Sequence, residues 1–385
     1  MISITDASKC CGCTACYASC PYGAITMKPD RLGFLYPEAD MSRCVDCGIC
    51  ESVCDFVRTS DMERSLPQVI PVIAARNKEA AVLESSQSGG VFSSLAKAVM
   101  TEGGTVYGAA YNQDFTVSHH RSETLAGCKA FRGSKYVQSE MGDIFLQVRK
   151  DLEEGRKVLF SGTPCQVAGL LAFVPTKLQS GLVTVDFICH GVPSPYVWRD
   201  YLDYMKRKGN LVSAVFRDKS AGGWKVHVES FGYANGKHVF RETYRVLFYK
   251  NVMLRHSCSV CPYDYSRRKA DVTIADFWGV DEMLPHLDGS QGTSMVIPMT
   301  EKGRDLVSAV LPELAAEKAD LPVEFISRRN PNLLRPSKIC HERQMFEDIY
   351  PEKGFLYAAR RWGDMGWRYK AWQLKVFVRK MFSKR

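Results

Sequence analysis

Short apolar runs alternate with amphipathic stretches along most of the chain, and this alternation predicts its secondary structure. Five short runs are rich in aliphatic and aromatic residues and have the composition of strands; they are Val69–Ala75, Thr105–Tyr111, Lys157–Ser161, Leu182–Cys189 and Asp271–Phe277. Four stretches carry apolar residues at helical spacing; they are Gly90–Thr101, Met141–Glu154, Pro164–Phe173 and Ser194–Lys208. Strands and helices that alternate in this way are typical of an α/β domain.

A further pair of strand-like runs, Trp224–Phe231 and Lys237–Tyr244, flanks the dipeptide Asn235-Gly236. Asparagine and glycine tolerate positive φ, so this dipeptide favours a hairpin turn between the two runs. A hairpin is antiparallel, whereas strands that are joined by helices are usually parallel. The sheet of this domain is therefore predicted to be mixed.

Cysteine is concentrated at the amino terminus, where the sequence also repeats itself. Nine of the 15 cysteines lie before residue 55. Asp6–Cys10 matches Asp40–Cys44 at an offset of 34 residues, and the cysteine spacing that follows is the same in both segments. A tandem duplication is the simplest interpretation.

The repeated spacing, Cys-x2-Cys-x2-Cys-x3-Cys, is that of bacterial ferredoxins with two 4Fe-4S clusters. In such modules three closely spaced thiolates bind one cluster, and the fourth cysteine of each run binds the other cluster. Zinc is the alternative, but a structural zinc site needs only four ligands, usually as two separated pairs. Cys11 lies outside the spacing and is predicted to be a small buried residue or a neighbour of the ligands. The predicted ligands are Cys10, Cys13, Cys16 and Cys54 for one cluster, and Cys44, Cys47, Cys50 and Cys20 for the other.

Composition and charge narrow the class of protein. A hydrophobic content of 45% and a charged content of 24% over 385 residues are typical of a folded chain with two or three domains. The sequence has neither a long uncharged apolar stretch nor a secretory signal, and clustered cysteines suit a reducing compartment, so a cytoplasmic protein is expected. The net charge of +9 lies mainly in the last 30 residues, where nine basic residues stand against one acid. A nucleic-acid-binding body is therefore not indicated.

The end of this basic tail has an amphipathic pattern. From Trp367, the apolar residues Ala371, Leu374, Val378 and Met381 follow at steps of three and four. A helix would gather them on one side, as in helices that lie peripherally on an anionic membrane or bind an acidic partner. A helix that packs on its own domain and keeps a solvated basic face is an equal alternative.

Six short segments of the large domain combine glycines, cysteines and aromatic residues; they are Ser88–Val91, Gly133–Ser139, Phe160–Gln166, Cys189–Ser194, Phe216–Lys219 and Ala270–Gly279. With these segments the chain resembles the family of coenzyme F-420 hydrogenase/dehydrogenase beta subunits, fused behind a dicluster ferredoxin module. The resemblance implies a flavoprotein that couples hydride chemistry on a deazaflavin or related substrate to iron-sulfur carriers. Its core would hold FAD and one further cluster. Ala275 departs from the family pattern, which usually has glycine at this position.

The resemblance also implies a ligand set for the further cluster. The alternatives are that some of these residues are ordinary buried cysteines, or that Cys258 and Cys261 contribute to a zinc site. Cys128 and Cys340 lack such a context and are expected to be structural. The implied ligands are Cys165, Cys189, Cys258 and Cys261.

Two glycine-containing turns, Ser88–Gly90 and Gly162–Pro164, lie at the starts of predicted helices. They give a flavin site a physical basis. Free backbone amides at the start of a helix attract a diphosphate. Plain helix capping is the alternative, since neither turn has the dinucleotide fingerprint. Lys135 would neutralise a phosphate, unless it is an ordinary solvated surface charge. The predicted cofactor-binding residues are Ser88, Gly89, Gly90, Ser134, Lys135, Gly162 and Thr163.

His190 and Asp276 are the candidate catalytic residues, because each lies at the end of a predicted strand. His190 would transfer protons or, equally, only donate a hydrogen bond to the backbone or to cluster sulfur. Asp276 would orient a cofactor or cap a turn. Neither a hydrolase triad nor a phosphate-binding P-loop stands out in the sequence.

The sequence predicts an α+β dicluster ferredoxin domain followed by an α/β domain with a mixed sheet. The predicted function is an iron-sulfur flavoprotein oxidoreductase that passes electrons between a small-molecule hydride donor or acceptor, FAD, 4Fe-4S clusters and a redox partner protein or ferredoxin. The alternatives are an electron-transfer subunit with no substrate of its own and an accessory protein with structural clusters. The predicted boundaries are residues 1–58 for the ferredoxin domain, 59–68 for a linker, 69–345 for the large domain and 346–385 for the tail.

Overall fold

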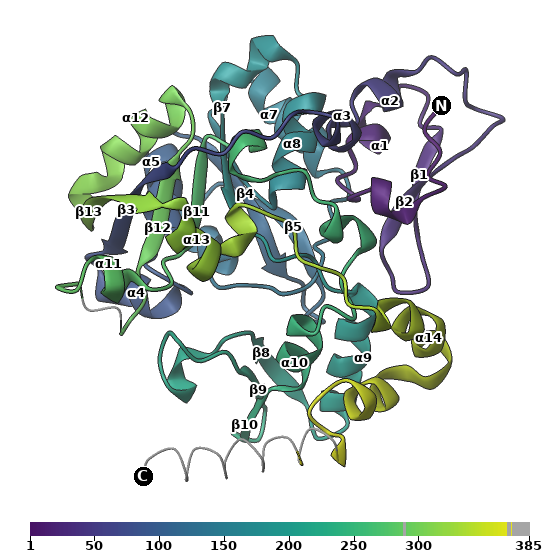
Figure 1. Ribbon diagram of the computed structural model, residues 1–385. Helices are drawn as coiled ribbons and strands as arrows, with labels where there is room; N and C mark the ends of the chain where they lie inside the picture. Colours follow the sequence, from purple (N-terminus) through teal and green to yellow (C-terminus); the bar gives the residue numbers. More distant parts are fainter. Residues whose placement is uncertain (288–289, 368–370, 372–385) are drawn as a thin grey trace.

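The large domain is built on an eight-stranded sheet (Figure 1). The computed structural model describes residues 1–287, 290–367 and 371. The strands are β3 (Val69–Asn77), β4 (Thr105–Tyr111), β5 (Val117–Ser122), β6 (Val158–Ser161), β7 (Leu182–Phe187), β11 (Val272–Asp276), β12 (Ser294–Pro298) and β13 (Leu314–Pro322). Their order is β13-β3-β12-β11-β7-β6-β4-β5. The central strands β4, β6, β7 and β11 are parallel, and antiparallel strands extend both sides. The five predicted strands are confirmed, and the main sheet is mixed as predicted. The predicted reason for the mixed sheet is wrong, because the predicted hairpin lies in a separate sheet and the antiparallel pairs come from β5, β12 and β13, which were not predicted.

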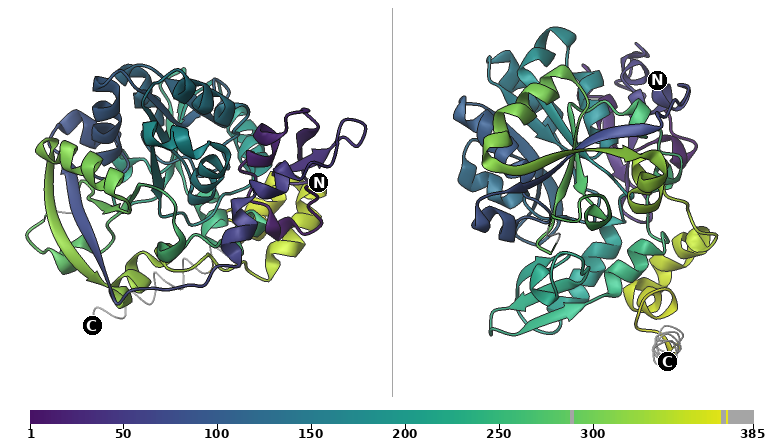
Figure 2. Two further views of the ribbon diagram at one scale, coloured as in Figure 1. Left: turned by 90° about the horizontal axis from the view of Figure 1, so that it is seen from above. Right: turned by 60° about the vertical axis from the view of Figure 1, so that its left-hand side comes forward.

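Helices cover both faces of this sheet, as the views of Figure 2 show. One face packs against α5 (Val91–Thr101) and α12 (Glu301–Val310). The other face packs against α7 (Ile144–Glu153), α8 (Pro164–Phe173) and α13 (Val323–Arg329). Alternate residues of each strand point to opposite faces, so Val72 of β3 meets one helix layer and Ile73 the other. The remaining short helices are α4 (Ala80–Ser85), α6 (Leu125–Cys128) and α11 (Val280–Met283).

A smaller antiparallel sheet stands beside the main one and contains the predicted hairpin. Its strands are β8 (Leu211–Val215), β9 (Glu229–Tyr233) and β10 (His238–Arg241), and it packs with α9 (Pro195–Lys206) and α10 (Thr243–Tyr249). The hairpin turn at Asn235-Gly236 is confirmed, with Gly236 at a φ of 78°. The outer parts of the two predicted runs are not strands. Trp224 lies in a turn that buries its indole, and residues from Thr243 form a helix.

The smaller sheet, α9 and α10 share one hydrophobic core and are called the second unit. The helix α14 (Glu342–Arg361) belongs to this core. Phe346, Tyr350, Phe355 and Trp362 are all buried there. The start of the predicted tail is therefore packed on its own domain. Of the amphipathic pattern that begins at Trp367, Leu374, Val378 and Met381 lie outside the described residues. Among the described residues, no helix has the length and apolar character needed to cross a membrane.

The amino-terminal module consists of short elements around the cysteines: α1 (Ala15–Ser19), β1 (Ile25–Pro29), β2 (Leu35–Ala39), α2 (Ile49–Ser52) and α3 (Asp55–Ser60). Its backbone repeats as the sequence does. Gly12 and its counterpart Asp46 have φ of 71° and 53°, and Thr14 and its counterpart Gly48 have φ of 70° and 74°. Left-handed conformations at equivalent positions, even where glycine is exchanged for another residue, support the predicted duplication. Residues 61–68, between α3 and β3, form neither helix nor strand.

Candidate functional site

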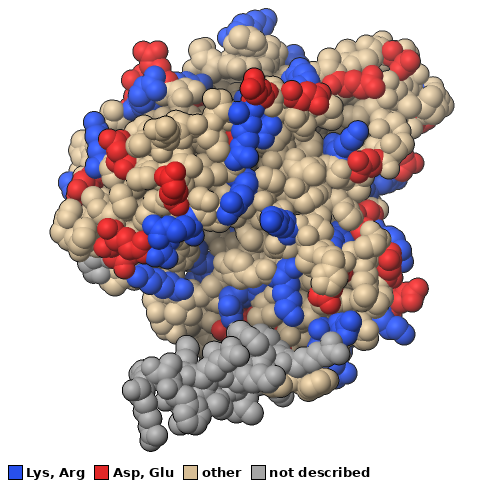
Figure 3. Space-filling view, in the orientation of Figure 1, with Lys and Arg blue, Asp and Glu red and all other residues tan. Residues whose placement is uncertain are grey.

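A cavity of about 500 Å³ lies at the carboxyl ends of the parallel strands. The ends of β6, β7 and β11 line it, together with the start of α5 and residues 131–139. In open α/β sheets, ligands bind beyond these strand ends. The charged lining is mainly basic, and Lys and Arg also run down the middle of the face drawn in Figure 3. The cavity therefore suits an anionic ligand; its charged lining residues are Arg132, Lys135, Arg217, Arg329 and Asp276.

Six of the seven predicted cofactor-binding residues line this cavity: Ser88, Gly90, Ser134, Lys135, Gly162 and Thr163. Gly89 lies behind them against the sheet. Its backbone N–H donates to Oγ of Ser294 at 3.0 Å, and a Cβ at Gly89 would stand 2.1 Å from the carbonyl oxygen of Ala75. A glycine is therefore required there for packing, and its amide already has a partner.

The two predicted phosphate-binding turns differ in how their helices are capped. Thr163 and Gln166 form a complete capping box at the start of α8. At the start of α5, Gly90 has a φ of 75° and supplies no side-chain cap. Close by, Gln87 lines the cavity, and its buried Nε2 has no hydrogen-bond acceptor within the described part of the chain. Unpaired donors at α5 fit a ligand rich in acceptors, such as a diphosphate.

Lys135 enters the cavity as a desolvated amine. Its Nζ donates to the carbonyl oxygens of Ala130 and Arg132, both at 2.8 Å. Burial lowers the pKa of Lys135 to about 7, because the ammonium form loses hydration. The side chain therefore changes its charge near neutral pH, and an anionic ligand would favour the charged form.

The two candidate catalytic side chains both reach the cavity, and both are already held by neighbours. Nδ1 of His190 lies 3.2 Å from Oδ1 of Asn332, and its Nε2 lies 2.7 Å from Oδ1 of Asn251. Asp276 accepts from Nε1 of Trp224 at 3.0 Å and forms an ion pair with Arg217. Both arrangements fix the side chain in place, which favours orienting roles for the two residues.

The group of side chains around Asp276 was not predicted from the sequence. Trp224 and Trp278 stack with ring centroids 4.6 Å apart and planes 11° from parallel. The guanidinium of Arg217 lies 5.1 Å from the centre of the Trp278 ring. Arg217 belongs to a segment that carried the family resemblance, but its partner Asp276 is 59 residues away. Nothing in the local sequence marks such a pair.

The four cysteines implied for a further cluster, Cys165, Cys189, Cys258 and Cys261, line one small cavity. They come from the start of α8, the end of β7 and the segment after Arg255. Burial raises the pKa of Cys258 to about 11 and that of Cys261 to about 12. Metal ions would displace these protons, so the donor set fits a soft metal centre. Residues Cys189–Val192 line both this cavity and the large one, so the two sites share a wall.

The amino-terminal cysteines of the first predicted set lie close together. Burial raises the pKa of Cys16, and the nearby Cys13, Cys10 and Cys54 raise it further. In the other set, Cys20 and Cys50 pack in one cluster with Ile2, Ile25 and also Cys16 of the first set. Cys44 is half-buried and Cys47 is exposed. Among the described residues, no three His, Cys, Asp or Glu side chains have the spacing of a site for a single metal ion. In a 4Fe-4S cluster each thiolate binds a different iron, so the four cysteine sulfurs need not have the spacing of ligands to a single metal ion.

Cys11 connects the amino-terminal module with the core cysteines. Its side chain is 6% exposed and packs with Phe56, Ala168 and Tyr263. Hydrogen bonds with Cys13 and Cys165 raise the pKa of the Cys11 thiol well above its usual range. The prediction that Cys11 is a small buried residue beside the ligands is consistent with this position.

Arg255 holds the amino-terminal module against the large domain. The side chain is fully buried, and its Nε donates to the carbonyl oxygen of Cys10 at 2.7 Å. Its two Nη atoms donate to the carbonyl oxygen of Leu35 at 2.9 Å and to Oε1 of Gln138 at 3.0 Å. The guanidinium also lies 4.1 Å from the centre of the Tyr36 ring. One side chain therefore joins two segments of the amino-terminal module to the core.

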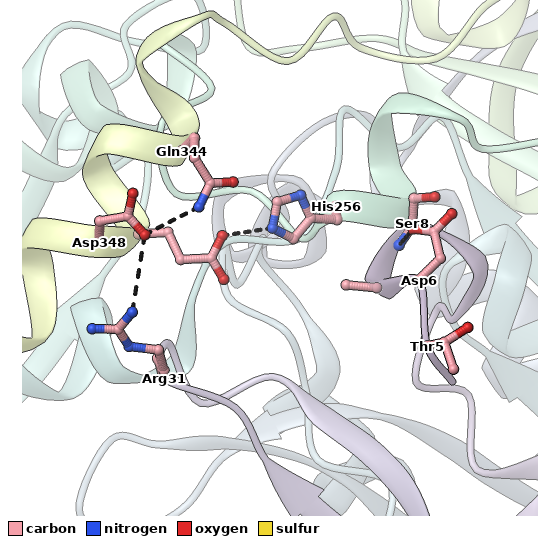
Figure 4. A pocket seen from close by; sticks show the side chains of 9 residues that line it. Thr5, Asp6, Ser8, Arg31, His256, Gln344 and Asp348 are labelled. Carbon is pink, nitrogen blue, oxygen red and sulfur yellow. Dashed lines mark hydrogen bonds and ion pairs between the residues drawn. The ribbon is translucent and has the colours of Figure 1, made fainter. Parts of the chain in front are cut away.

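A third cavity, of about 470 Å³, lies where this module meets α14 (Figure 4). Two polar contacts line it: Nε2 of His256 lies 2.6 Å from Oε2 of Glu347, and Nη1 of Arg31 lies 3.9 Å from Oδ1 of Asp348. None of the predicted site residues lines it. We assign it to the contact between the module and the core.

Two family models match the chain. Residues 9–56 match the model of the 4Fe-4S dicluster domain. Residues 155–322 match the model of the carboxy-terminal part of the beta subunit of coenzyme F420 hydrogenase/dehydrogenase. The chain therefore contains one segment similar to a dicluster domain and a second segment similar to the carboxy-terminal part of the coenzyme F420 hydrogenase/dehydrogenase beta subunit. The resemblance predicted from the sequence is confirmed for these two segments.

Among curated proteins, the chain is similar to one of the subunits of the F(420)H(2) dehydrogenase of Methanosarcina mazei. The two are 28% identical over 166 residues, which is 41% of this chain and 46% of that relative. The match thus spans about half the length of the relative. Among solved structures, an F420-reducing NiFe hydrogenase complex from Methanosarcina barkeri is similar at 18% identity and a TM-score of 0.45, over 68% of this chain and 86% of that chain.

Proposed function

We propose that the chain is an iron-sulfur flavoprotein oxidoreductase that passes electrons between a hydride donor or acceptor and a redox partner. One observation carries the proposal. The four core cysteines share the wall Cys189–Val192 with the large cavity on one side. On the other side, Cys165 reaches Cys13 of the amino-terminal module through Cys11. Redox groups at these places would form one continuous series.

Twelve cysteines would hold three 4Fe-4S clusters, which supply one-electron transfer when they are bound. The dicluster domain supports the two amino-terminal clusters. The third is proposed from the grouping of the core cysteines around one cavity. The proposed ligand sets are Cys10, Cys13, Cys16 and Cys54; Cys44, Cys47, Cys50 and Cys20; and Cys165, Cys189, Cys258 and Cys261.

FAD is the proposed occupant of the large cavity, where a flavin would supply two-electron hydride chemistry and one-electron steps. The uncapped start of α5, with Gly90 and the free Nε2 of Gln87, would bind its diphosphate. Lys135 would neutralise phosphate charge. His190 and Asp276 would orient the ligand from the strand ends, each held by the neighbours described above.

A deazaflavin coenzyme or a related molecule is the proposed hydride partner, because the matched family model and the curated relative both name coenzyme F420. The proposed redox partner is a protein that approaches the outer cysteines. Cys47 is exposed, and Met41, Val45 and Ile49 in the same segment expose apolar side chains. An apolar surface next to a redox centre suits a transient protein contact.

The alternative is an electron-transfer subunit with no substrate of its own, and it is favoured by the name of the curated relative, which is one part of a larger dehydrogenase. The full chain, reconstituted anaerobically with iron, sulfide and FAD, distinguishes the two. We expect about twelve irons and one flavin per chain, with bleaching of both chromophores by reduced F420. Clusters without flavin would support the electron-transfer role, and clusters that no donor reduces would support an accessory role.

A further inference from the structure

A chain of buried hydrogen bonds leads from the large cavity toward the core cysteines. It begins at His119, whose Nε2 lies 3.0 Å from the carbonyl oxygen of Ser161. A carbonyl only accepts, so this nitrogen carries the ring proton. Nδ1 of His119 therefore accepts from the hydroxyl of Ser139 at 2.9 Å. Burial lowers the pKa of His119 to about 4, so the ring stays neutral at pH 7.

This tautomer fixes the orientation of the Gln166 side chain. Because the Ser139 hydroxyl donates its hydrogen bond to His119, its oxygen is free to accept one from Nε2 of Gln166 at 3.0 Å. The amide oxygen of Gln166 then faces Thr163 and accepts its backbone N–H at 2.9 Å. Thr163 and Gln166 are 7% and 4% exposed, so these bonds are largely shielded from water.

The Thr163 hydroxyl has one proton and two acceptors within reach. Oε1 of Gln166 is 3.0 Å away, and Sγ of Cys165 is 3.1 Å away. The Gln166 oxygen already accepts the backbone N–H of Thr163, whereas a metal-bound Cys165 is a thiolate, and an ionised acceptor attracts a donor more strongly than a neutral one. The hydroxyl is therefore expected to turn to sulfur when Cys165 is a ligand.

We propose that Thr163 is a positioning residue whose hydroxyl donates to Sγ of Cys165 and thereby raises the reduction potential of the core cluster. The proposal rests on the proposed function, because it requires a cluster at the four core cysteines. Hydrogen bonds to cluster sulfur stabilise the reduced state, which carries more negative charge. This role differs from the phosphate contact predicted for Thr163 from the sequence.

The test is a redox titration of the reconstituted full-length protein, followed by electron paramagnetic resonance. The signal of the core cluster is the component that disappears in the double variant Cys258→Ser/Cys261→Ser. Thr163→Val keeps the shape of threonine but removes the hydroxyl. We expect the ratio of reduced to oxidised core cluster, at a fixed potential, to fall about three- to tenfold, which is about 30 to 60 mV for a one-electron couple.

Two further variants separate the hydrogen bond from the capping role of Thr163. Thr163→Ser keeps both the donor and the cap, so its ratio should stay within about twofold of the wild type. Thr300→Val removes a capping threonine from α12, which carries none of the cysteines. It should lower stability without moving the core potential. A Thr163→Val protein with full iron content and an unchanged core potential would overturn this inference but would leave the proposed function standing.

A wild-type protein with about eight irons per chain, the content of the two amino-terminal clusters, would overturn the proposed core cluster and this inference together. Should Thr163→Val fail to assemble, Gln166→Met tests the same bond from the opposite direction. It removes the competing acceptor, so the Thr163 hydroxyl is left with Cys165. The reduced fraction should then rise or stay level, and a fall would contradict the inference.

Discussion

Gly169 of α8 lies against the sulfur of Cys13 with no room for a side chain between them. A Cβ at Gly169 would stand 2.6 Å from Sγ and 2.9 Å from Cβ of Cys13. The same helix begins at Pro164 and carries Cys165 in its first turn. A glycine at this position therefore allows the amino-terminal module to approach the core cysteines closely, and it is part of what brings the two proposed redox sites together.

Gly169→Ala should push Cys13 and its segment away from α8. Overpacking of this kind costs about 1 to 3 kcal/mol, offset in part by the better helix propensity of alanine. We expect a lower thermal midpoint and a loss of iron from the amino-terminal module, while the iron at the core cysteines remains. An unchanged iron content and thermal midpoint would mean that the module contacts α8 less closely than described.

Changing both Cys258 and Cys261 to serine should remove about four irons per chain, because serine is a poor ligand for soft cluster iron. Iron analysis of the reconstituted protein measures the loss. Cys340→Ser is the matched control, since Cys340 is half-buried and lies outside the proposed ligand sets. Equal iron contents in the double variant and the control would show that these thiols are structural.

The affinity for flavin should depend on pH through Lys135. The pKa of this amine is lowered from 10.5 to about 7. Above pH 7 the free protein loses this positive charge, so the binding of FAD should weaken by at most about tenfold per pH unit until the pKa of the complex is reached. Isothermal titration calorimetry between pH 6 and about 9 measures the slope. The variant Lys135→Met should bind more weakly at pH 6 and without this slope; the same slope in the variant would assign it to another group.

Stability should depend on pH through Glu229, whose side chain is fully buried in the second unit. Burial raises its pKa from 4.5 to about 8, although it accepts the backbone N–H of Arg245 at 2.7 Å. Between these values the folded protein keeps a proton that the unfolded chain has released, so stability falls as pH rises. Glu229→Gln should therefore be more stable than the wild type at pH 9, by up to about 5 kcal/mol.

Urea unfolding at several pH values measures this difference. Near pH 4.5, the pKa of Glu229 in the unfolded chain, the free energies of unfolding of Glu229→Gln and the wild type should be nearly the same. Above about pH 8, the pKa of Glu229 in the folded protein, the variant should have the larger free energy of unfolding. Glu84→Gln, at an exposed position of α4, serves as the control and should follow the wild type. A parallel pH dependence in Glu229→Gln and the wild type would refute the assignment.

The features that the sequence predicts correctly are those set by local pattern. The cysteine spacing repeats over a short range, and five of the eight strands of the main sheet are apolar runs that can be identified from their own neighbours. The strands β5, β12 and β13 were not predicted, and β5 and β13 carry polar and charged residues in place of an apolar run. Trp224 shows the limit of this reasoning. It starts an apolar run that has the composition of a strand, but its indole stacks on Trp278, and this tertiary contact draws its segment out of the sheet.

Contacts between distant segments could not be predicted from one sequence. Arg255 donates to the carbonyl oxygen of Cys10 across 245 residues, and neither residue type indicates such a partner. Cys11 is similar. Its place outside the ferredoxin spacing was visible, but its contact with Cys165 depends on how the module packs against α8. The connection between the two domains is thus a property of tertiary packing.

The most direct test of the central claim is rapid anaerobic reduction of the full-length protein by reduced F420, followed by visible absorbance and by freeze-quench electron paramagnetic resonance. The wild type should show flavin reduction followed by reduction of the amino-terminal clusters. The variant Cys258→Ser/Cys261→Ser should keep flavin reduction, while its amino-terminal clusters remain oxidised on the same time scale. If these clusters are reduced equally fast in both proteins, electrons do not pass through the core cysteines, and the proposed redox series is wrong.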